Sequence, residues 1–87
     1  MKITAKFASN DGNVLIATFD QETHTVVDQT GRKGTYTRAE GSNTLEIDGD
    51  EKLSITISNP LEIKAGFTSP YTASNGKAGT MSIESVS

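Results

Sequence analysis

The sequence contains no cysteine, so disulfide bonds, thiol chemistry and cysteine-based zinc sites are all excluded. His24 is the only histidine, which leaves a single imidazole for any catalytic triad. No serine stands in the Gly-x-Ser-x-Gly pattern of a nucleophile elbow, and no phosphate-binding loop or dinucleotide fingerprint is present. These absences predict a protein that is not an enzyme and needs no cofactor.

The sequence also lacks a surplus of positive charge. It has eight basic and 11 acidic residues, and its formal net charge is −3. A protein that grips a phosphate backbone needs a basic surface, so we expect no nucleic-acid partner. No segment approaches the roughly 20 apolar residues that cross a bilayer, and Met1–Ser9 alternates instead of forming an apolar signal core. We therefore expect no membrane association and a cytoplasmic location. The alternative is the mature form of a periplasmic or secreted protein.

Alternation of apolar and polar residues is what the sequence does contain, for example over Ile3–Phe7 and Leu53–Ile57. Turn signals recur about every 8–12 residues, as in β-sandwiches and β-barrels. The pattern predicts one all-β domain over residues 1–87, with about seven or eight short antiparallel strands closed into a small up-and-down, lipocalin-like β-barrel. A β-sandwich is the alternative. At most one helical turn is expected, near Gln21–His24.

Two local patterns sharpen this prediction. Val14–Phe19 is apolar at both parities, which predicts a central strand covered on both faces. Leu61–Phe67 alternates and predicts a further strand, ended by Pro70 because proline cannot donate to a sheet ladder. Since a barrel of this strand number is just filled by its own side chains, we expect no room for a ligand.

A short motif occurs twice in the sequence. Ala-Ser-Asn stands at Ala8–Asn10 and again at Ala73–Asn75, with a glycine just beyond each copy. Asp-Gly and Asn-Gly favour tight hairpin turns because both residues tolerate positive φ. The recurrence predicts that one turn solution is used repeatedly in an antiparallel meander.

The stretch Gly34–Ile47 resembles a hairpin common in small lipocalin-like bacterial β-barrel domains. In that hairpin a Gly-x-Tyr strand turns into Asn-Thr-Leu-x-Ile, as Asn43–Ile47 does here. The resemblance covers one hairpin and implies the fold alone. The Ser-Gly-x-x-Tyr loop of the periplasmic lysozyme inhibitors, which are also small barrels, is absent from Thr30–Tyr36.

Positive charge gathers in one place, at Arg32 and Lys33, in a connection from Asp28 to Gly34 that is expected to be longer than the other turns. We expect Arg38 to lie near this pair. An arginine offers a forked set of donors and is enriched at interface hot spots, so these three residues are the candidate partner-binding site.

Asp20, Glu22 and His24 share one parity and would lie on one face of an extended strand. Two carboxylates and an imidazole suit a divalent metal, which makes these residues the candidate metal ligands. No second motif supports them, and the turn at Asp48–Glu51 is too short for a calcium loop. We therefore expect no bound metal.

These observations favour a non-enzymatic protein-binding module, such as a small inhibitor or an accessory factor, that acts through a loop or a strand edge on another protein. A small-molecule or carbohydrate-binding β-barrel is the alternative, and a hydrolytic or metal-dependent enzyme is the third. We expect a monomer or a weak homodimer. A cavity of a few hundred cubic ångströms would favour the ligand-binding alternative, whereas a filled barrel with one apolar patch would favour the protein partner.

Overall fold

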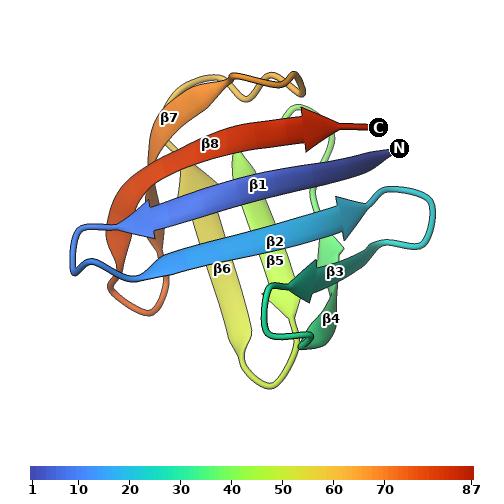
Figure 1. The fold of residues 1–87 in the computed structure, drawn as a ribbon, viewed down its shortest axis with the longest axis horizontal. Coiled ribbons are helices and arrows are strands. Elements are labelled where there is room, and N and C mark those ends of the chain that lie inside the picture. The colour runs from blue at the N-terminus through green and yellow to red at the C-terminus, as the bar shows by residue number, and fades with distance from the viewer.

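The computed structural model describes residues 1–87 and contains eight β-strands and no helix (Figure 1). The strands follow one another around a closed barrel, each antiparallel to the next, and the last strand pairs with the first. Their bounds are β1 Lys2–Ser9, β2 Val14–Asp20, β3 Thr25–Asp28, β4 Lys33–Thr37, β5 Thr44–Asp48, β6 Lys52–Ile57, β7 Thr68–Ala73 and β8 Ala78–Val86.

The predicted all-β barrel of about eight antiparallel strands is therefore confirmed. The β-sandwich alternative is not formed, because the strands close into one barrel and not into two packed sheets. The sequence allowed at most one helical turn, near Gln21–His24. In the structure these residues form a turn that is not helical. The structure has no helix of the length and apolar character needed to cross a membrane.

The barrel wall is one sheet thick, so side chains alternate between the interior and solvent along each strand. The predicted core strand at Leu53–Ile57 is confirmed as β6, where Ile55 is 2% and Ile57 1% exposed. Leu53 is only half-buried, because it lies nearer the end of the barrel. The buried apolar core comprises Ile3, Ala5, Phe7, Ala17, Phe19, Val26, Tyr36, Leu45, Ile55, Ile57, Phe67, Tyr71, Met81 and Ile83.

The one-layer wall also explains why the prediction for Val14–Phe19 was wrong. This segment is β2, but only one of its faces is covered, and Val14 and Ile16 are 44% and 38% exposed on the other. Strand β2 also extends past the end of β3. There the Gln29 side chain replaces the missing strand, since its amide oxygen accepts from the Ile16 N–H at 2.9 Å and its amide nitrogen donates to the Val14 carbonyl at 2.8 Å.

The connection between β6 and β7, residues 58–67, closes one end of the barrel. Leu61 and Ile63 pack against the core from this connection, and Phe67 is buried at its end. The prediction of a strand over Leu61–Phe67 was therefore wrong. The alternation is real, but its apolar residues reach the core from the end of the barrel and not from its wall.

Pro70 does not end a strand, as the sequence had indicated, but lies inside β7. The β6–β7 ladder runs from Ile55 to Ile57, and the next pair places Pro70 opposite Ser58. The Ser58 N–H donates to the Pro70 carbonyl at 2.9 Å. The Pro70 carbonyl, which also accepts from the Ser69 hydroxyl at 2.8 Å, thus accepts the last bond of the ladder, where the lack of an N–H costs no further pairing.

One hairpin turn is used three times, which confirms the prediction of a repeated turn, although the two Ala-Ser-Asn copies lie one position apart within it and the third turn lacks the motif. In each copy the first N–H donates to the fifth carbonyl and the glycine N–H donates back to the first carbonyl, with donor–acceptor distances of 2.8 to 3.1 Å. The glycines have φ of +90°, +87° and +86°, a left-handed conformation that glycine adopts without steric cost. The three turns are Ser9–Asn13, Asp28–Arg32 and Ala73–Lys77.

Candidate functional site

The two ends of the barrel differ. In an up-and-down barrel, successive connections alternate between the ends. The termini and the connections after β2, β4 and β6 lie at one end, which residues 58–67 close, so we call it the plugged end. The four tight connections after β1, β3, β5 and β7 lie at the other, which we call the hairpin end (Figure 1).

A cavity of about 380 Å³ opens at the hairpin end. Phe7, Ile55 and Tyr71, which belong to the buried core, form its floor, and Leu15 and Leu53 line its walls half-buried. The expectation that the barrel is filled by its own side chains is therefore wrong at this end.

Small side chains explain the empty space. Counting by twos from the buried residues of each strand gives the inward positions nearest the hairpin end. Four of these positions carry residues no larger than serine: Ser9, Gly34, Ala73 and Gly79. The interior consequently narrows to a packed core at the plugged end and widens toward the hairpin end.

A second cavity of about 460 Å³ adjoins the first on the β3–β5 side of the same opening. The two share part of their lining, namely Leu15, Arg32, Leu53 and Asn75. Their charges differ, because Arg32 and Lys77 are the only charged residues that line the first cavity. Three carboxylates, from Asp28, Asp50 and Glu51, line the second together with Arg32 and Lys33.

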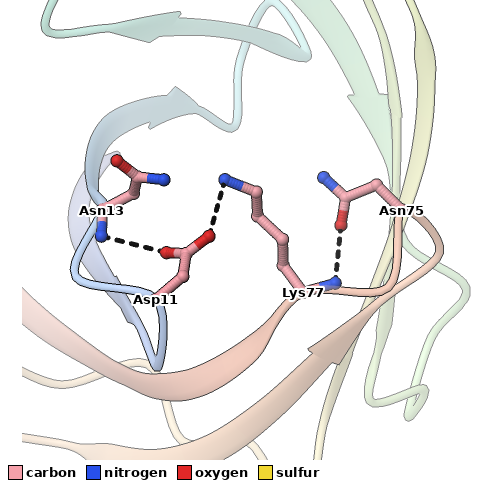
Figure 2. Close-up of polar contacts among 4 residues, drawn as sticks. All are labelled: Asp11, Asn13, Asn75 and Lys77. Carbon is pink, nitrogen blue, oxygen red and sulfur yellow. Dashed lines mark hydrogen bonds and ion pairs between the residues drawn. The ribbon is translucent and has the colours of Figure 1, made fainter.

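Two of the repeated hairpins supply a row of polar side chains at the rim of the first cavity, as Figure 2 shows. Asp11 accepts the Asn13 N–H at 3.0 Å, and Asn75 accepts the Lys77 N–H at 3.0 Å. Lys77 Nζ lies 3.3 Å from the second Asp11 oxygen and so joins the two hairpins. The Asn13 and Asn75 amides and the Lys77 ammonium group therefore lie together at the opening.

The hydrogen bond from the Asn13 N–H lowers the pKa of Asp11 to about 2, and Lys77 contributes to the same shift. A hydrogen bond from Thr30 likewise lowers the pKa of Asp28, which organises the β3–β4 hairpin. Both carboxylates remain ionised at neutral pH, because donors in their own turns favour the charged form.

These shifts predict how stability depends on pH. A folded-state pKa below the ordinary value means that the carboxylate stabilises the fold above that value and that this contribution is lost as the pH falls through the folded pKa. For Asp11 the window runs from pH 3.8 down to about 2. We expect the midpoint of urea unfolding to fall in this window, and to fall less steeply in Asp11→Asn. The same acid dependence in both proteins would contradict this account of the hairpin.

Aromatic packing supports the floor of the first cavity. The rings of Phe7 and Tyr71 meet edge to face, with centroids 5.3 Å apart and planes at 87°. Burial raises the pKa of the Tyr71 phenol above its ordinary value of 10.0. The phenol therefore stays protonated at neutral pH, and its hydroxyl is a neutral donor and acceptor in the cavity lining.

Arg32 and Lys33 lie at the hairpin end, but not on the long loop that the sequence predicted. β3 ends at Asp28 and β4 begins at Lys33, so four residues connect the strands. Asp28 Oδ1 accepts the N–H groups of Thr30 and Arg32 at 2.9 and 3.0 Å, which orders this connection as a tight turn. Arg32 lines both cavities, and Lys33 lines the second.

Arg38 lies far from this pair, at the plugged end. It follows β4 and enters the β4–β5 connection, where its Nε donates to the Ser42 carbonyl at 2.7 Å. Arg38, Leu61 and Ile63 line a small apolar space of about 50 Å³ beneath the plug. The structure therefore does not bring the three predicted partner-binding residues together.

Of the candidate metal ligands, Asp20 ends β2 and Glu22 and His24 lie on the turn that follows, so strand parity does not align the three. Asp20 Oδ1 accepts the Glu22 N–H at 3.0 Å, and Glu22 lies 3.8 Å from the Met1 amino group. His24 has a φ of 57° and its ring lies 6.1 Å from that of Tyr36. The structure contains no group of three such side chains placed to hold a metal ion.

Sequence analysis missed most of the residues at the opening, including Leu15, Leu53, Asn13, Asn75 and Lys77. The two leucines were assigned to a filled core, and the three polar residues to ordinary hairpin turns. The available signal was the pair of matching turn dipeptides Asp11-Gly12 and Asn75-Gly76, because the turns after β1 and β7 lie at the same end of the barrel and on neighbouring hairpins.

No protein-family model, curated protein or solved structure matches the chain. Function must therefore be inferred from the cavity and its lining.

Proposed function

We propose that this chain is a non-enzymatic binding module that takes a small amphipathic molecule into the hairpin end of its barrel. The observation that carries the proposal is the cavity of about 380 Å³, which has an apolar floor inside a rim of convergent polar groups. Small-molecule sites commonly have this lining, occur in the mouths of β-barrels and measure roughly 300–1,000 Å³. The cavity favours the ligand-binding alternative over the protein-binding module, which was favoured while the barrel was expected to have no room for a ligand.

A protein partner is the second candidate function. It is supported by Arg32 and Lys33, which make no ion pair and lie at the same opening. The closed barrel has no free edge strand, so a partner of this kind would contact the hairpin end and not extend the sheet. The same opening is thus the binding face under both functions, and the two differ in whether the cavity is occupied.

The proposal predicts that 1-octanol, an uncharged amphipathic probe, binds inside the opening. We expect a dissociation constant on the order of 1 mM, as is usual for ligands of about ten non-hydrogen atoms. In amide NMR spectra of labelled protein, the shifts should concentrate at residues that line the cavity, such as Leu15, Leu53 and Ala73.

Ala73→Leu provides the matched test, because it fills the cavity without removing any core group. We expect this variant to melt at or above the wild-type temperature and to lose the octanol-induced shifts. The control is Ala39→Leu, an exposed position of the β4–β5 connection at the plugged end, which should bind as wild type does. Absence of octanol-induced shifts in the wild type would contradict the proposal and favour the protein partner.

A further inference from the structure

The charged residues in the lining of the first cavity indicate which charge a ligand should carry. Its only charged residues are Arg32 and Lys77, and both are positive. Lys77 is already paired with Asp11 at 3.3 Å, and Asp11 stays ionised because its own turn stabilises the charged form. Asp11 therefore offsets part of the charge of the Lys77 ammonium group at the rim.

Arg32, by contrast, has no hydrogen-bonded or ion-paired partner for its guanidinium, although the pKa of Asp28, which is lowered mainly by Thr30, is also lowered by the charge of Arg32. Its backbone N–H is bonded to Asp28, but its side chain makes neither an ion pair nor a hydrogen bond. It lies on the wall shared by the two cavities, so its donors can reach a ligand in the first. A guanidinium presents its donors as a planar fork that matches the two oxygens of a carboxylate.

The charges that line the two cavities differ, and they favour an anion in the first cavity over the second. Asp28, Asp50 and Glu51 line it, and these carboxylates repel an anionic group. No carboxylate is part of the lining of the first cavity, which includes Asn13, Asn75 and Arg32, and the one carboxylate at its rim, Asp11, is paired with Lys77. An anionic headgroup is thus favoured at the rim of the first cavity, above the apolar floor.

We propose that the ligand is an amphipathic monocarboxylate, whose carboxylate binds Arg32 at the rim and whose apolar body lies on Phe7, Leu15, Leu53 and Ile55. Size supports this class, because 380 Å³ holds roughly a dozen non-hydrogen atoms if each takes about the 30 Å³ of a water molecule. A straight-chain carboxylate of eight to ten carbons is of that size. The inference rests on the proposed function and adds the charge of the ligand to it.

The test compares three probes of equal chain length, octanoate, 1-octanol and octylamine, by amide NMR titration at neutral pH and low salt. Octanoate should bind most tightly and octylamine least. Arg32→Ala should weaken octanoate binding by about tenfold, because a charge-assisted hydrogen-bonded pair is lost. The same variant should weaken octanol binding much less than octanoate binding, since the alcohol forms no charge-assisted pair with the guanidinium.

Arg38→Ala is the matched control, because it removes the same charge at the plugged end, and it should not change octanoate binding by more than about twofold. Equal weakening by both arginine variants, or octanoate binding no tighter than octanol, would overturn the carboxylate assignment and leave the proposed function standing. Failure of all three probes to bind the wild type would overturn both.

Discussion

Gly79→Ala is expected to prevent stable closure of the barrel. Gly79 lies on β8 opposite Ser9 of β1, the pair of strands that joins the two ends of the chain into a barrel. A Cβ atom at Gly79 would overlap the carbonyl oxygen of Ala8, a backbone atom that cannot move without breaking the ladder. We expect a loss of at least about 3 kcal/mol of unfolding free energy in urea melts, the upper range for forced overpacking.

Gly49→Ala is the control, because a Cβ there would lie 3.8 Å from the nearest atom, the Lys33 carbonyl oxygen, an ordinary contact. Its φ is not in the left-handed region, so alanine can adopt the backbone. We expect a change below about 1 kcal/mol, in either direction, from the lower chain entropy of alanine. A Gly79→Ala protein that melts as this control does would show that β1 and β8 do not approach as described.

Ile55→Ala should cost roughly 2–5 kcal/mol, the usual range for truncating a buried isoleucine. Ile55 is 2% exposed at the centre of β6, between Leu45 of β5 and Ala73 of β7. A chain of 87 residues has a total stability of roughly 4–13 kcal/mol at 0.05–0.15 kcal/mol per residue, so this one change removes a large share of it.

Ile16→Ala is the matched comparison for Ile55→Ala, since it deletes the same atoms from an outward position that is 38% exposed. We expect a loss under about 1 kcal/mol in the same urea melts, because little apolar area returns to water. Similar losses for the two variants would mean that the inward and outward faces of the barrel wall have been assigned incorrectly.

Period-two alternation was enough to predict the strands, since it reports which side chains face the core regardless of what the core contains. The hairpins could be predicted from Asp11-Gly12 and Asn75-Gly76, where the local conformation is determined by residues within the turn itself. Where two elements share such a pattern, the sequence does not distinguish them. Leu61–Phe67 alternates as a strand does, yet it forms the plug, because a chain crossing the end of a barrel also needs apolar groups on one side only.

The candidate site was less predictable, because its residues are related only by barrel closure. Arg32 was identified from charge alone, and its placement between two cavities follows from the positions of β2, β6 and the β7–β8 hairpin. Arg38 is only six residues away in sequence, but β4 carries it to the opposite end. The same alternation of connections sets Asn13 beside Lys77, which are 64 positions apart in the chain.

The sequence by itself determined that the chain forms short antiparallel strands joined by tight glycine turns around a thin apolar core. Alternation and turn chemistry are local properties, so they can be recognised in the sequence without knowing which strands pair with one another. Only the tertiary structure decided which end is plugged and which is open. That outcome depends on how Ser9, Gly34, Ala73 and Gly79 align around the barrel, and alignment across eight strands is a consequence of register and closure.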